Sequence, residues 1–262
     1  MKPIVRRGLG LLLLIACATV WIVSSGMSRR ALAIRTCTGK ETLDVCVKDS
    51  LERRFVAKED VEKWLDSEYG AYAGLRLDSV NLARIESLIL SHSAVKTCEA
   101  WLTDDGTLHL ELTQREPVVR FDTGSNGYYS DSDGFIFPLQ ARGTVDVPVV
   151  DGKLPLTVPR GFKGELSAPE QKLWLAKIIA MAELMKGSEW DKNIAKITVD
   201  DGGNLVLTPL AGKETFLFGP PDRIAEKFSL MEKYYASVLP SKDPDYYKTV
   251  DVRYKGQLVC RK

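Results

Sequence analysis

The sequence of 262 residues has few of the side chains on which enzymes and metal sites depend. It contains only two histidines, His92 and His109, and neither lies at metal-ligand spacing from a Cys, Asp or Glu. The sequence also lacks the G-x-S-x-G elbow of a serine hydrolase, and its two Gly-Lys-Glu-Thr stretches lack the earlier glycine of a phosphate-binding loop. We therefore expect no catalytic residue, cofactor, metal or small-molecule substrate, and we predict that the chain is not an enzyme.

Acidic residues are absent from residues 1–35, although this stretch holds six basic ones: Lys2, Arg6, Arg7, Arg29, Arg30 and Arg35. The rest of the chain is consequently acidic, even though the formal net charge of the whole is +1. Nucleic-acid binding depends on clustered Lys and Arg, so an acidic folded part argues against such a partner. With 45% hydrophobic and 27% charged residues, the composition excludes a disordered, collagen-like or disulfide-packed chain.

Long hydrophobic runs are also scarce, since only residues 8–27 form one. These twenty residues carry no charge, and at 1.5 Å per residue a helix of this length spans a bilayer core of about 30 Å. The run predicts a single transmembrane anchor helix after a short tail at residues 1–7. Basic residues flank it evenly on both sides, so the charge bias alone does not orient it.

Two cleavable-signal interpretations of the same region stay open. Residues 14–17 (Leu-Ile-Ala-Cys) resemble a lipoprotein box in which Cys17 would be lipidated, although residues 19–23 remain apolar beyond it. Residues 31–33 (Ala-Leu-Ala) resemble a signal-peptidase site, although two arginines and a long apolar run precede them.

The four cysteines outside this region do not fix a redox chemistry. No two of them form a C-x-x-C pair, and their number permits disulfides in an oxidising compartment without establishing them. The sequence therefore leaves open whether these cysteines are free thiols or form disulfide bridges; they are Cys37, Cys46, Cys98 and Cys260.

Residues 43–116 have the pattern of a small α+β domain. Residues 43–47 alternate as a half-buried strand does, a helix is predicted over residues 58–65, and Asn81 is a plausible N-cap for a second helix. Residues 96–102 and the alternating residues 107–113 form a hairpin signature around an Asp-Asp-Gly turn, with His109 on the solvent face. The predicted order is strand, helix, helix, strand, strand.

Residues 117–262 predict a mixed β domain with helices on its sheet, so residues 43–262 as a whole are α+β. One helix begins near Ser167 and carries Leu173, Ile178 and Met181, and another follows Pro220-Pro221 and carries Ile224, Phe228 and Met231. Residues 131–134 (Asp-Ser-Asp-Gly) predict a turn rather than a calcium loop. Pro117 favours a domain junction, and the preceding Arg115 and Glu116 fit a solvated surface pair equally well. The predicted strands cover residues 118–121, 128–130, 135–137, 194–199, 205–209, 215–218, 250–254 and 258–260.

Four stretches together resemble one protein family. They are residues 106–118 (GTLHLELTQREPV), 128–138 (YYSDSDGFIFP), 147–152 (VPVVDG) and 250–260 (VDVRYKGQLVC). In order and spacing they are similar to the FtsQ/DivIB cell-division family, in the form found in Bacteroidota. The resemblance implies a cytoplasmic tail at residues 1–7, an anchor at 8–27, a POTRA domain at 43–116 and a C-terminal β domain at 117–262.

The resemblance also implies a function. Proteins of this family are non-catalytic scaffolds of the inner membrane, with the N-terminus in the cytoplasm and the bulk of the chain in the periplasm at the division septum. They bind the division proteins FtsB and FtsL and help to recruit and regulate the septal peptidoglycan synthases, which are further candidate partners. The motif match transfers a partner-contact role to Arg253 and Tyr254, and less directly to neighbours in the terminal strand: Asp251, Val252, Leu258 and Val259.

The residues themselves give a physical reason for such a role. Val250, Val252 and Tyr254 alternate with charged residues, which predicts a strand with one apolar and one charged face. At a sheet edge such a strand would accept a strand from a partner. A core or rim tyrosine remains the other interpretation of Tyr254, and the sequence lacks the aromatic residue that follows this strand in some relatives. The alternative function is a POTRA-bearing envelope transport or assembly factor that chaperones exported polypeptides.

Overall fold

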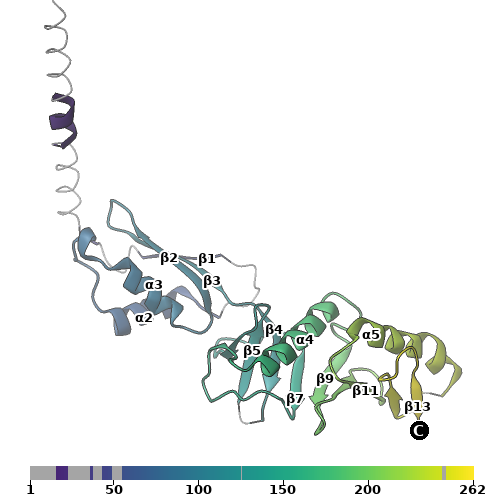
Figure 1. The fold of residues 1–262 in the computed structure, drawn as a ribbon. Coiled ribbons are helices and arrows are strands. Elements are labelled where there is room, and N and C mark those ends of the chain that lie inside the picture. The colour runs from purple at the N-terminus through teal and green to yellow at the C-terminus, as the bar shows by residue number, and fades with distance from the viewer. Residues whose placement is uncertain (1–15, 23–35, 38–42, 49–54, 125, 244–245) are drawn as a thin grey trace, which may run out of the picture. The chain divides into compact units, whose positions relative to one another are not determined.

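The computed structural model describes residues 16–22, 36–37, 43–48, 55–124, 126–243 and 246–262. The chain divides into two compact units, the first comprising Met1–Ser50 and Val56–Gln114 and the second Leu51–Phe55 and Arg115–Lys262 (Figure 1). Residues 16–22 are helical, and Cys17 is exposed. Most of the predicted anchor and the Ala-Leu-Ala stretch lie outside the described residues. Within the described ranges, no helix combines the length and apolar character that a membrane crossing requires.

The first unit has the element order that the sequence predicts. A hydrogen bond from the Arg84 backbone N–H to the Asn81 side chain (2.9 Å) caps the second helix, as expected. The first helix continues into a π-helix at Leu65–Tyr69, which ends at Gly70 with a φ of 96°. The main elements are β1 (Asp44–Val47), α2 (Lys58–Trp64), α3 (Leu82–Leu90), β2 (Val95–Leu102) and β3 (Leu108–Gln114).

The core of this unit lies between a three-stranded sheet and its two helices. The strand order is β1-β3-β2, in which β3 runs parallel to β1 and antiparallel to β2. Helices α2 and α3 lie on one side of the sheet (Figure 1). The alternation read from the sequence places the leucines of β3 inward, and the fully buried side chains are Val61, Leu65, Ile85, Ile89, Leu108, Leu110 and Leu112.

His109 lies on the outer face of this sheet, as predicted. Its ring stacks on Trp101 with 5.2 Å between centroids, and its Nδ1 lies 2.9 Å from a carboxylate oxygen of Asp44. Asp44 is 65 residues away in the sequence, so its proximity follows from the parallel pairing of β1 and β3.

The second unit is built on a ten-stranded mixed sheet with the order β13-β12-β11-β10-β9-β7-β4-β5-β6-β8. Two short strands, β7 and β8, were not predicted, because four and two residues are too few to show an alternating pattern. The bounds of its elements are β4 (Pro117–Asp122), β5 (Gly127–Asp131), β6 (Phe135–Pro138), β7 (Val149–Gly152), β8 (Gly164–Glu165), α4 (Pro169–Met185), β9 (Ile194–Val199), β10 (Leu205–Pro209), β11 (Thr215–Gly219), α5 (Ile224–Lys233), β12 (Thr249–Asp251) and β13 (Val259–Arg261).

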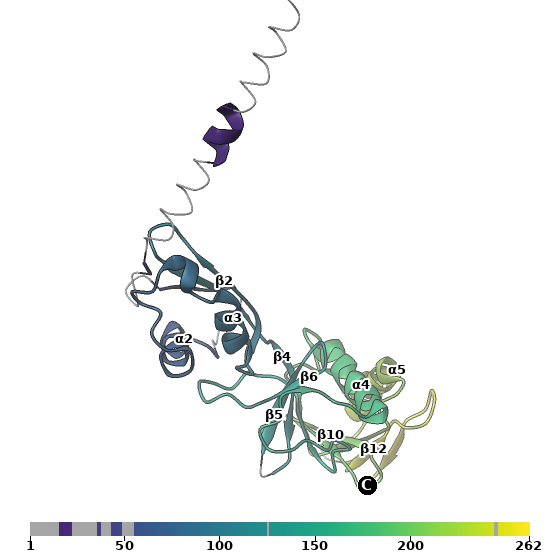
Figure 2. The same cartoon turned by 60° about the vertical axis from the view of Figure 1, so that its left-hand side comes forward.

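Both helices of this unit belong to crossovers between parallel strands. Helix α4 lies between the parallel strands β7 and β9, and α5 between the parallel strands β11 and β12. The two helices lie along the same side of the sheet (Figures 1 and 2). One core joins them to the strands, with Ile178 and Met181 from α4 and Phe228 and Met231 from α5 among its buried members.

The segment that opens the second unit is held by a buried ion pair. Arg115 Nη1 lies 2.7 Å from Asp131 Oδ2, and its guanidinium carbon lies 3.4 Å from the centroid of the Phe135 ring. The interpretation of Arg115 and Glu116 as a solvated pair is therefore wrong for Arg115, which finds its partner 16 residues later. The predicted turn at residues 131–134 is confirmed, since Asp131 Oδ1 accepts hydrogen bonds from the Asp133 and Phe135 amides.

Four cysteines of the described residues are free thiols, among them the exposed Cys17. Cys46 is exposed, Cys98 is buried and Cys260 is half-buried. Burial raises the pKa of the Cys98 thiol to about 12, so this thiol stays protonated and unreactive at neutral pH.

Candidate partner-binding site

The residues predicted to contact a partner gather at one end of the ten-stranded sheet. Strand β13 is the end strand, and β12 is paired on both sides, with β11 and with β13. The prediction of a single strand over residues 250–254 that could form the edge is therefore wrong. Strand β12 ends at Asp251, and the edge belongs to β13, with Val259 opposite Asp251 and Cys260 opposite Val250.

Strand β12 ends at Asp251 because its carboxylate turns back onto the following backbone. The Arg253 amide donates to Asp251 Oδ1 (3.2 Å), and the Arg253 guanidinium donates to both carboxylate oxygens, from Nε at 2.8 Å and from Nη2 at 2.6 Å. The predicted charged outer face is therefore wrong for Asp251, whose side chain is fully buried. The hydrogen bonds from Arg253 hold the pKa of Asp251 below its usual value, and the same pair raises the pKa of Arg253.

The side chain of Arg253 also depends on a glycine in the neighbouring strand. Gly219 ends β11 with a φ of 75°, and a Cβ at this position would lie 2.8 Å from Arg253 Cγ. Any larger residue would push the alkyl part of Arg253 away from the sheet and strain the backbone as well. The glycine thus leaves room for Arg253 to reach Asp251.

Residues at the start of α5 hold the turn at residues 252–257. Arg223 Nη2 donates to the carbonyl oxygen of Arg253 (2.7 Å), and Glu226 Oε1 accepts a hydrogen bond from the Gly256 amide (2.8 Å). Arg223 has a φ of 45°, a left-handed conformation that is uncommon for a residue other than glycine. Both contacts join residues 30 positions apart, so no local pattern of residues predicts either.

A buried lysine fixes the loop before α5. The side chain of Lys227 is fully buried, and its Nζ donates to the carbonyl oxygen of Pro220 and to Asp222 Oδ1, both at 2.6 Å. Desolvation lowers the pKa of Lys227, and the hydrogen bond from Lys227 lowers the pKa of Asp222. The burial of Lys227 could have been predicted from the sequence. Lys227 lies three residues after Ile224 and four before Met231, on the helix face that these apolar residues share.

The predicted contact residues differ sharply in their access to a partner. Asp251 and Val252 are fully buried, so their side chains are not accessible to a partner. Arg253 and Leu258 are half-buried, whereas Tyr254 and Val259 are exposed, with 49% and 36% of their surface accessible. The exposed set therefore consists of one aromatic side chain, one aliphatic side chain and the outer edge of β13.

The potential metal ligands of the described residues are dispersed. These residues contain no group of three or more His, Cys, Asp or Glu side chains placed to hold a metal ion. The charged groups near β12 form ion pairs and hydrogen bonds with one another and with the backbone of the turn at residues 252–257.

Comparison with known protein families agrees with the two units. A family model described as FtsQ/DivIB, C-terminal related, matches residues 116–261, which is more than half of the chain, and a POTRA-like domain model matches residues 36–113. No curated protein matches the chain. The chain therefore belongs to the FtsQ/DivIB family and combines a POTRA-like domain with the C-terminal domain of that family.

Proposed function

We propose that this chain is a non-catalytic scaffold of the bacterial division machinery, and that β13 accepts a strand from an FtsB- or FtsL-like partner. Membership of the FtsQ/DivIB family supports a role in cell division and in protein–protein interaction. The observation that carries the finer proposal is the position of β13, which has a neighbouring strand on one side only among the described residues. An edge strand of this kind carries main-chain donors and acceptors that a partner strand can satisfy.

In this proposal the side chains around β13 decide which strand is accepted. Tyr254 offers a large, rigid contact surface with a polar end, which is typical of residues that dominate binding energy. Val259 and Leu258 would contact apolar side chains of the added strand. Arg253 is a positioning residue, because its guanidinium is already bound to the buried carboxylate of Asp251.

The proposed location follows from the apolar run at residues 8–27 and from the family. We place the chain in the bacterial inner membrane, with the N-terminus in the cytoplasm and residues 36–262 in the periplasm at the septum. There it would help to recruit and regulate the septal peptidoglycan synthases. A fluorescent fusion tests this placement, since enrichment at midcell supports division and a uniform envelope signal favours a transport or assembly factor.

The binding proposal is tested with the full-length double variant Tyr254→Ala, Val259→Lys. The lysine places a charge on the strand edge, a substitution that natural proteins use to prevent edge pairing. We expect loss of co-purification with the FtsB–FtsL pair and a septation defect in cells that carry only this variant. Leu90→Lys is the matched control, because Leu90 is an exposed aliphatic residue of α3, in the first unit. Unchanged co-purification and septation in the double variant would contradict the proposal.

A further inference from the structure

Helix α4 is apolar on more sides than its contact with the sheet requires. Its buried face carries Leu175, Ile178 and Met181 among others. Leu173 lies outside this face and is 60% exposed, because a separation of five residues along a helix turns its side chain well away from that of Ile178. Helices that are apolar all round are normally covered on all sides.

The exposed apolar residues of α4 form a second stripe. They are spaced three, four and four residues apart, which places them on one side of the helix, and they are Leu173, Ala176, Ala180 and Leu184. Leu184 is 41% exposed. The stripe lies outside the buried core of the second unit, and two of its members, Ala176 and Ala180, also line a pocket.

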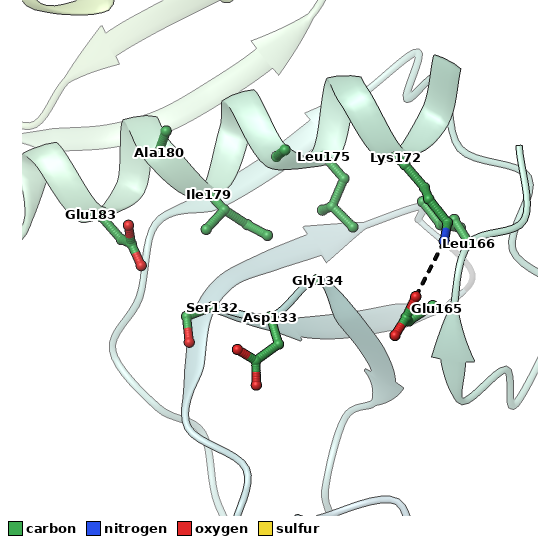
Figure 3. Close-up of a pocket in the computed structure, with 11 residues that line it drawn as sticks. Ser132, Asp133, Gly134, Glu165, Leu166, Lys172, Leu175, Ile179, Ala180 and Glu183 are labelled. Atoms are coloured by element: carbon green, nitrogen blue, oxygen red, sulfur yellow. Dashed lines mark hydrogen bonds and ion pairs between the residues drawn. The ribbon is translucent and has the colours of Figure 1, made fainter. Parts of the chain in front are cut away.

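A pocket adjoins this stripe. It has a volume of about 410 Å³ and lies between α4, the β5–β6 turn and the start of the segment after β8. Leu166, Leu175 and Ile179 form its apolar floor, with Ala176 and Ala180 beside them. Figure 3 shows Leu175 and Ile179 pointing from α4 toward the turn that carries Ser132 and Asp133. The volume is in the range of pockets that bind small ligands or the anchoring side chains of a peptide.

The rim of the pocket is acidic. Asp133, Glu165 and Glu183 line it, against the single base Lys172, which lies 3.2 Å from the Glu165 carboxylate (Figure 3). Within the described part of the chain, Glu183 has no ion-pair partner. An apolar floor with an excess of carboxylates at the rim is complementary to an apolar side chain that is flanked by Lys or Arg.

We propose that this surface, the pocket and the exposed stripe of α4, docks a basic amphipathic segment of a partner protein. An apolar side chain of that segment enters the pocket over Leu175 and Ile179, its helix or strand covers Ala176 and Ala180, and a Lys or Arg lies against Glu183. The site does not depend on the proposed strand addition, because β8 and β13 are at opposite ends of the sheet. The occupant is a protein segment rather than a lipid surface, because an acidic rim opposes approach to anionic membranes.

The proposal is tested by titrating the full-length chain, labelled with ¹³C at its alanine methyl groups, with three helical peptides of equal length. The first has Leu at helical spacing flanked by Arg, the second replaces each Arg by Glu, and the third replaces each Leu by Ser. We expect the methyl signals of Ala176 and Ala180 to shift with the first peptide only. The buried methyl groups of Ala94 and Ala182 report whether the fold is intact.

Two variants of the same chain locate the binding. Ala180→Arg introduces bulk and positive charge at the pocket, and Glu183→Lys reverses one rim charge; each should weaken binding of the Arg-Leu peptide about tenfold or more. Lys233→Ala, an exposed residue of α5 outside this surface, should leave the affinity unchanged. Three results would each overturn the proposal: no shift at Ala176 and Ala180 with the first peptide, equal affinity for Ala180→Arg, or methyl shifts on dilution of the protein alone, which would show that a second copy occupies the surface.

Discussion

Charged side chains are arranged differently at the two ends of the ten-stranded sheet. At the β13 end, charged side chains bind one another, as in the contact of Asp251 with Arg253 and of Lys227 with Asp222. At the β8 end, carboxylates line an open pocket, and Glu183 has no ion-pair partner among the described residues. The first end is therefore suited to hold a backbone edge in a fixed position, and the second to receive a charged side chain.

The two edge strands differ as well. Strand β8 has only two residues, one of them the charged Glu165, and a strand this short and charged is a poor template for pairing. Strand β13 has three residues and pairs with β12. The turn at residues 252–257, which joins the two strands, is held by hydrogen bonds with Arg223 and Glu226. The two ends of one sheet therefore present different surfaces.

The largest expected effect tests whether buried charge stabilises the β13 end. Lys227→Ala removes a fully buried side chain and leaves a cavity, so we expect the free energy of unfolding to fall by about 3 kcal/mol. Lys227→Met fills the same space, and because the Asp222 side chain is 47% exposed and can be hydrated, we expect a loss of only about 1 kcal/mol. Urea unfolding followed by tryptophan fluorescence measures both. Lys233→Ala, on the exposed side of the same helix, is the control, and equal effects at the two lysines would contradict the assignment.

The next effect concerns binding at the same end. Tyr254→Ala should weaken association with the FtsB–FtsL pair by about 2 kcal/mol, a loss typical of an aromatic anchor. Because Tyr254 is 49% exposed, the free energy of unfolding should change by less than about 0.5 kcal/mol. Calorimetric titration of the purified full-length chain measures the affinity. A large loss of stability without a loss of affinity would instead make Tyr254 a structural residue of the sheet.

A smaller effect is expected from the acid dependence of the Asp251–Arg253 pair. Asp251→Asn should lower the free energy of unfolding by about 1 kcal/mol at pH 7, a modest value because Arg253 is partly exposed. The pKa of Asp251 in the folded chain lies below the unfolded value of about 3.9, so its carboxylate stabilises the fold above that pH. This contribution is lost as the pH falls through the folded pKa.

The difference between the natural chain and Asp251→Asn should therefore be constant from pH 7 to 5 and shrink below about pH 4. Unfolding measured across this range checks the sign. Asp201→Asn is the matched control, since the side chain of Asp201 is 93% exposed. A difference that grows in acid would mean that the Arg253 contact does not stabilise the carboxylate.

The smallest effect is expected at the opposite end of the sheet. Leu173→Ser and Leu184→Ser alter exposed residues of α4, so each should change the free energy of unfolding by less than about 0.5 kcal/mol. Ile178→Ser, on the buried face, should cost several times more. Thermal unfolding of the three variants checks whether the second stripe of α4 is free of the core. A large loss at Leu173 would place it in the fold rather than on a docking surface.

The sequence predicts the elements of this fold well where one periodicity dominates. The alternation of leucines in β3 and the side-chain cap at Asn81 both correspond to observed structure, because each depends on residues within a few positions. The sequence does not predict the burial of Asp251 and Arg115, because each is buried in an ion pair that forms only on folding. The contacts of Arg223 and Glu226 with the turn after β12 join residues 30 positions apart and leave no periodic signal.

The candidate site was thus only partly predictable. The sequence and its family resemblance pointed to the terminal region, and the structure assigns the edge to β13 rather than to residues 250–254. The pocket beside α4 had no counterpart in the sequence prediction. Its floor and rim come from three separate segments that only the strand order brings together.

Hydrogen exchange of the full-length chain, alone and with the FtsB–FtsL pair, tests the central claim most directly. Strand addition would satisfy the outer amides of β13, so exchange at Val259–Arg261 should slow on binding, whereas exchange at Gly164–Glu165 in β8 should not change. Binding that leaves exchange in β13 unchanged, or that slows it only at β8, would contradict the account.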